Sequence, residues 1–129
     1  MKLTVKGELG QMIKRRDPAP KFYDAPCSMV AVGTATGSFP PPPADLTPDG
    51  YLSLAGMNRY CRAMLPVAKA VRFRRGERPT LKEFLEGNRQ RAVICVLGHF
   101  IYADGNTYWS FLRNAKDPVV QVWYLKEEG

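Results

Sequence analysis

The chain is poor in the residues that bind metal ions or build disulfide frameworks. It has one histidine, His99, and three cysteines, Cys27, Cys61 and Cys95, with no Cys-x-x-Cys pair. A structural zinc site needs about four such ligands at short spacing, so the sequence implies no metal. A glycine-rich phosphate loop followed by lysine is also missing, and no organic cofactor is implied. Three cysteines are an odd number and far from a disulfide framework, so we expect thiols in a reducing compartment.

Long apolar runs are missing as well. No stretch approaches the ~20 apolar residues that a membrane-spanning helix requires. The first 11 residues lack the apolar centre of a secretory signal, so we expect a cytoplasmic protein without membrane contact. A chain of 129 residues can bury one core but hardly two, which predicts a single domain over residues 1–129.

Acidic side chains are outnumbered. Twelve Asp and Glu residues against 19 Lys and Arg residues give a formal net charge of +7. This excess favours acidic partners, nucleic acid among them, and equally keeps a small domain in solution. The basic residues are concentrated in two clusters, residues 14–16 and the group Arg72, Arg74, Arg75 and Arg78.

Local signals predict three helices, over residues 24–37, 53–65 and 80–87. Asp24 is a good N-cap for the first helix, and Ser53 for the second. Thr80 and Glu83 form a capping box at the start of the third. The first helix is apolar on nearly all sides, which predicts that it is buried.

The remaining elements are predicted to be strands. Residues 91–97 form a continuous apolar run that is typical of a buried central strand. Asp104-Gly105 predicts a type I′ hairpin turn. Further strands are expected over residues 2–5, 67–74 and 119–125, with Val67, Val71 and Phe73 on one face. The predicted fold class is α+β, with the helices packed on one side of a mainly antiparallel sheet.

Two segments are expected to lie outside this framework. Residues 1–20 are predicted to be a flexible N-terminal segment. Residues 38–50 contain four consecutive prolines, which predicts a stiff, extended loop rather than a helix or strand.

Cys27 and His99 are the residues that combine into chemistry. Cys27 falls in the first turn of a predicted helix, where free amides and the helix dipole favour an anion and lower a thiol pKa. Cys61 and Cys95 lie in apolar surroundings and are expected to be buried. His99 follows the central strand and can face that helix N-terminus. Cysteine with histidine supports thiolate–imidazolium catalysis, and a hydrogen-bonded structural histidine is the alternative.

The two segments that carry these residues resemble a known family. Residues 24–37, DAPCSMVAVGTATG, resemble the nucleophile helix of compact papain-like cysteine peptidase domains, including those of phages and mobile elements. Residues 98–105, GHFIYADG, resemble their histidine strand and its hairpin, and the order of the two segments matches. The resemblance implies a papain-like fold and a thiol protease that hydrolyses peptide or isopeptide-type bonds of a protein substrate. Cys27 would be the nucleophile and His99 the general base.

The family's remaining catalytic groups have no obvious counterpart. A third residue usually orients the histidine. Pairing of Ala103 with Asn106 would set His99 opposite Ser110, so Ser110 and Asn114 are the candidates. Asn114 lies beyond the strand and would have to fold back, as would Asp117. The family often places an oxyanion-hole glutamine before the cysteine, and Gln11 is the upstream candidate here.

Other classes of function stay open. The fold without activity is one alternative. Another is a non-catalytic basic protein that binds a protein partner or nucleic acid through the two basic clusters. A third is a protein that acts by contact alone, through the aromatic side chains Tyr108, Trp109, Phe111 and Trp123, which suit a sheet core equally well.

Overall fold

The central strand of the protein is the apolar run that the sequence singles out. In the computed structural model, which describes residues 12–127, this run is β3 (Arg91–Val96). Residues Ala92 to Val96 are at most 6% exposed. A strand that is apolar in consecutive positions has to be covered on both faces of its sheet, and that requirement arranges the rest of the chain.

The strands form one six-stranded sheet in the order β1-β5-β4-β3-β6-β2. All neighbouring pairs are antiparallel except β1 and β5, which are parallel. The prediction of a mainly antiparallel sheet is therefore confirmed. The other strands are β1 (Lys14–Arg16), β2 (Val67–Arg72), β4 (His99–Asp104), β5 (Thr107–Trp109) and β6 (Val119–Leu125).

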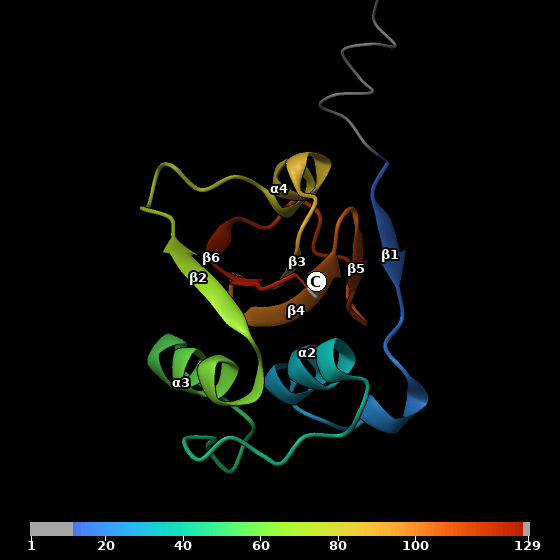
Figure 1. Cartoon of the computed structure of the whole chain (residues 1–129), viewed down its shortest axis with the longest axis vertical. Coiled ribbons are helices and arrows are strands. Elements are labelled where there is room, and N and C mark those ends of the chain that lie inside the picture. The colour runs from blue at the N-terminus through green and yellow to red at the C-terminus, as the bar shows by residue number, and fades with distance from the viewer. Residues whose placement is uncertain (1–11, 128–129) are drawn as a thin grey trace, which may run out of the picture.

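Helices cover both faces of this sheet. α2 (Cys27–Thr36) and α3 (Leu54–Met64) pack on the face that carries Val93 and Cys95. α4 (Leu81–Gly87) packs on the opposite face, against Ala92, Ile94 and Val96. Figure 1 shows α2 and α3 together below the sheet and α4 above it. The α+β class is confirmed, but the expectation that all helices lie on one side is wrong for α4, because β3 has no polar face to leave open.

The helix ends follow local chemistry. Ser53 accepts a hydrogen bond from the Gly56 amide, and Thr80 forms both bonds of the predicted capping box with Glu83. α2 ends where Gly37 takes a φ of 83°, a left-handed conformation that suits glycine. Its start differs from the prediction, because the N-cap is Pro26 rather than Asp24. A 3-10 helix, η1 (Pro20–Phe22), precedes it. Cys27 is therefore the first residue of α2.

The edge strands are the least predictable part of the sheet. A strand at residues 14–16 was not predicted, because three consecutive cationic side chains show no apolar alternation. In β2 the register shifts between Val67 and Lys69. Val67 therefore packs with the α2 face and Phe73 with the α4 face, and the prediction that they share a face is wrong. The predicted strand over residues 2–5 lies outside the described residues.

Two tight turns join the strands around β4. Leu97 and Gly98 connect β3 to β4, with Gly98 at a φ of 72°. Gly105 and Asn106 connect β4 to β5, since Asp104 pairs with Thr107. Gly105 alone has a positive φ there, which fits a type II′ turn and not the predicted type I′. Ala103 consequently pairs with Tyr108, and the predicted pairing with Asn106 is wrong.

The proline-rich segment at residues 38–50 contains neither helix nor strand, as predicted. It is fixed to α3 by the Tyr60 hydroxyl, which donates to the Pro41 carbonyl at 2.7 Å. Within residues 12–127, no helix has the length and apolar character needed to cross a membrane.

Packing of η1 against α2 gives a test of the fold. A Cβ atom added at Gly33 would lie 2.6 Å from Phe22 Cζ and 3.0 Å from Pro40 Cδ. We expect Gly33→Ala to lower the free energy of unfolding by about 1–3 kcal/mol through overpacking, although alanine is the better helix former. Urea denaturation measures the change.

Gly87→Ala is the matched control, because a Cβ atom there meets nothing within 4 Å. It should leave the free energy of unfolding unchanged or raise it by up to about 1 kcal/mol. Equal effects of the two substitutions would contradict the described packing.

Candidate functional site

A cavity of about 300 Å³ opens at the turn between β3 and β4. Leu97 and Gly98 of that turn line it. So do Cys27, from the start of α2, and His99, from the start of β4. The two residues that the sequence singles out thus line one cavity, although they are 72 positions apart in the chain.

The Cys27 side chain is half-buried against β4. Burial raises the pKa of its thiol, and the backbone amides of Phe100, Cys27 and Ser28 act in the opposite direction. The expected lowering of the pKa at this helix N-terminus is therefore wrong, because loss of solvent outweighs the amides. Cys61 and Cys95 are buried as predicted, and burial raises the pKa of each thiol to about 12.

His99 is held by a chain of directed hydrogen bonds. Its Nε2 lies 3.1 Å from Ser110 Oγ, and that hydroxyl donates to Asn114 Oδ1 at 2.8 Å. A hydroxyl has one proton to donate. Ser110 Oγ must therefore accept from His99, as it accepts from the Leu112 amide at 3.1 Å. In the neutral ring the proton is on Nε2, and Nδ1 has the free lone pair.

The series of hydrogen bonds that begins at His99 ends at the carboxylate of Asp117. Asn114 Nδ2 donates to Asp117 Oδ2 at 3.3 Å. Burial lowers the pKa of His99, and the negative charge of Asp117 partly offsets that effect. Both candidates for the third residue, Ser110 and Asn114, are thus in contact with His99 directly or through one step. Asp117, which the sequence marked together with Asn114 as a residue that would have to fold back, completes the series.

The loop that carries this chain is anchored on α4. The amides of Leu81 and Lys82, in the first turn of α4, donate to the carbonyls of Asp117 and Ala115 at 2.9 and 3.0 Å. These amides have no partner within their own helix, so the loop satisfies them. Ser110 follows β5 directly and is 2% exposed, which explains its contact with His99 despite the shifted register.

Cys27 and His99 both line the cavity. Among residues 12–127, no hydrogen bond joins the Cys27 sulfur to the His99 ring. Strand alternation assigns His99 to the α4 face of β4, together with Ile101 and Ala103, whereas Cys27 packs on the α2 face. The two side chains approach each other only at the end of the sheet, beside the Leu97-Gly98 turn.

The predicted oxyanion-hole residue, Gln11, lies outside the described residues. The backbone amide of Cys27 is in the first turn of α2, where it has no carbonyl partner within the helix. It is therefore a hydrogen-bond donor beside the sulfur. No group of three or more His, Cys, Asp and Glu residues in the described part of the chain is placed to hold a metal ion.

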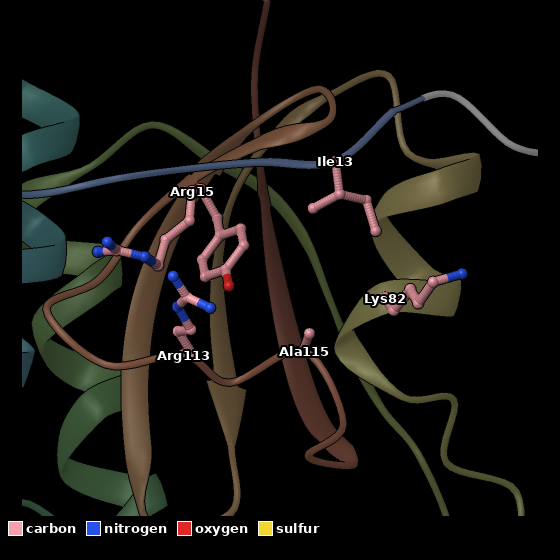
Figure 2. Close-up of a pocket in the computed structure, with 6 residues that line it drawn as sticks. Ile13, Arg15, Lys82, Arg113 and Ala115 are labelled. Atoms are coloured by element: carbon pink, nitrogen blue, oxygen red, sulfur yellow. The ribbon is translucent and has the colours of Figure 1, made fainter.

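The two basic clusters do not merge into one surface. Lys14, Arg15 and Arg16 belong to β1 and Arg72 to β2, the two opposite edges of the sheet. Arg15 and Arg113 line a separate hollow with Lys82, whose ammonium points away from both arginines in Figure 2.

Internal ion pairs reduce the charge of this second hollow. Arg15 pairs with Asp17 at 2.6 Å, and Lys82 pairs with Glu86 at 2.7 Å.

The aromatic residues do not form one exposed patch either. Tyr108 and Trp123 are 3% and 0% exposed and belong to the core. Phe111 is exposed and packs edge-on against Tyr23, with ring centres 5.4 Å apart. Of the two roles open to these side chains, an interface or the sheet core, Tyr108 and Trp123 have the second.

Comparison of the chain with protein-family models, with curated proteins and with solved structures finds no match. The function has to be argued from the site itself.

The charge of Asp117 gives a test of the hydrogen-bond chain. We expect Asp117→Asn to lower the pKa of His99 further, because the substitution removes the charge that stabilises the imidazolium ion. The chain has a single histidine, so one ring signal in an NMR titration reports the result without assignment.

Asp104→Asn is the control, since Asp104 is an exposed residue at the far end of β4. An unchanged or raised His99 pKa in Asp117→Asn would show that the carboxylate does not act on the ring.

Proposed function

We propose that the protein is a papain-like, cysteine-dependent hydrolase of peptide or isopeptide-type bonds, with Cys27 as the nucleophile and His99 as the general base. One observation carries the proposal. The Ser110–Asn114–Asp117 chain occupies His99 Nε2 and leaves the Nδ1 lone pair on a ring that lines the same cavity as the Cys27 thiol.

The direction of the pKa shifts defines the resting state. Burial raises the pKa of Cys27 and lowers that of His99, so both changes favour a neutral thiol beside a neutral imidazole. In this state the imidazole acts as a base during the attack and is not already charged before it.

The steps follow from this state. The Cys27 sulfur attacks the substrate carbonyl carbon as its proton moves to His99 Nδ1. The Cys27 amide stabilises the oxygen that becomes negative. Asp117, acting through Asn114 and Ser110, favours the imidazolium ion that forms. The imidazolium then returns the proton to the leaving amine, and a thioester remains on Cys27. A water molecule, deprotonated by His99, hydrolyses the thioester and frees the thiol.

The attack requires Cys27 Sγ and His99 Nδ1 to come within hydrogen-bond distance. Catalytic hydrogen bonds are often long before substrate binds and shorten in the complex. Leu97 is 65% exposed and lies in the turn between the two side chains. A reducing, cytoplasmic setting fits the proposal, because the nucleophile must stay a free thiol.

Alkylation of the three cysteines tests the proposed pair. Iodoacetamide should label Cys27 at least ten times faster than Cys61 or Cys95 at pH 7, because the latter thiols are buried. His99→Ala should slow labelling of Cys27 by about 100-fold or more, the usual contribution of a general base. Peptide mass spectrometry separates the three sites.

Ser110→Ala and Thr107→Ala are a matched pair of hydroxyl deletions. Ser110→Ala should slow labelling of Cys27 and shift its pH profile, because the His99 tautomer is no longer imposed. Thr107→Ala, in the neighbouring strand, should not. Labelling of Cys27 that is indifferent to His99→Ala would refute the catalytic pair and leave His99 as a structural residue.

A further inference from the structure

The cavity that contains Cys27 and His99 also contains two arginines. Arg72, at the end of β2, and Arg78, before α4, are among the residues that line it. No aspartate or glutamate lines it. Two cationic residues, the exposed Arg72 and the half-buried Arg78, therefore line a small space that no carboxylate lines.

The position of Arg78 is fixed by its surroundings. It is half-buried, and its Nε donates to the Phe73 carbonyl at 3.4 Å, so its two terminal nitrogens are left for another partner. Its charge acts on the Cys95 thiol, whose pKa is otherwise raised by burial and by the nearby Cys27 sulfur. The guanidinium is thus close to the Cys95 sulfur, which lines the same cavity as Cys27.

Neither arginine is neutralised within the described part of the chain. The three ion pairs there join Arg15 to Asp17, Arg59 to Asp45 and Lys82 to Glu86. The cavity is also lined by apolar residues, among them Leu52, Leu54, Leu97 and Val120, which lower its polarity. An anion beside two arginines in such a setting is bound more strongly than on an open surface.

We propose that Arg72 and Arg78 select substrates with a carboxylate next to the bond that is cleaved, so that the enzyme acts on acidic peptides. This inference rests on the proposed function for the cleavage step. The arginine pair would hold the carboxylate by charge-assisted hydrogen bonds, and the leucines would contact the methylene groups that carry it. Cys27 and His99 would then act on the adjacent carbonyl.

Two alkylating reagents that differ only in charge test the proposal without a known substrate. Iodoacetate and iodoacetamide transfer the same carbon to sulfur with loss of iodide and of the thiol proton, and only iodoacetate carries a carboxylate. We compare the rate of Cys27 labelling by iodoacetate with that by iodoacetamide. We expect the iodoacetate-to-iodoacetamide rate ratio to fall about tenfold or more in the double variant Arg72→Gln/Arg78→Gln, because electrostatic attraction of an anion contributes at least that factor. In the wild type, the ratio should also fall with added salt.

Arg75→Gln is the matched control. Arg75 is exposed, lies between the two arginines in sequence and does not line the cavity, so its loss should leave the ratio unchanged. Cys61 reports on folding in the same samples, because it stays unlabelled only while the core is intact. The single variants Arg72→Gln and Arg78→Gln replace the double variant if Cys61 becomes labelled.

The outcomes separate the two proposals. Fast labelling of Cys27 with the same rate ratio in wild type and double variant overturns the carboxylate site and leaves the hydrolase. If neither reagent labels Cys27, the proposed hydrolase is overturned. Succinate then tests the arginine site by itself. In that titration, NMR shifts of the Gly98 and Phe100 amides that vanish in the double variant support the site, and shifts that persist or never occur overturn it.

Discussion

Burial of β3 on both faces is the constraint on which the rest of the structure depends. α2 and α3 cover one face and α4 covers the other. Cys27, the first residue of α2, lies at the end of the sheet where β3 turns into β4. The first turn of α4 binds the loop whose Ser110 contacts His99. Cys27 and the loop that holds His99 come from opposite layers. Both lie at the same end of the sheet because β3 has to be buried on both faces.

The same burial governs the chemistry of the site. Water is largely removed from both the thiol and the imidazole, and each loses part of its tendency to ionise. For His99, the negative charge of Asp117, at the end of the hydrogen-bond series from Nε2, partly offsets that loss. Both shifts favour the neutral forms of the thiol and the imidazole, and the cavity that these two residues line is also lined by two arginines.

Sequence reasoning succeeded where the signal is local. Ser53, the Thr80–Glu83 pair and Gly37 mark helix ends by bonds to residues at most four positions away, and the apolar run of β3 needs no knowledge of its neighbours. It failed where distant segments decide. The parallel pairing of β1 with β5 and the bulge in β2 leave no trace in local periodicity. The turn between β4 and β5 lies at residues 105–106, one position later than predicted, and this changes the pairing of β4 with β5. The thiol pKa followed burial, which helix position alone does not reveal.

β1 contributes three residues to the sheet, and these pair with all three residues of β5. Its parallel pairing with β5 and the Ser110 amide, which donates to the Arg16 carbonyl at 3.1 Å, cover the outer side of β5. A chain shortened beyond Arg16 would leave the amides and carbonyls of that side open to another molecule. Exposed edges of this kind pair with one another, so this short cationic strand protects the sheet against self-association.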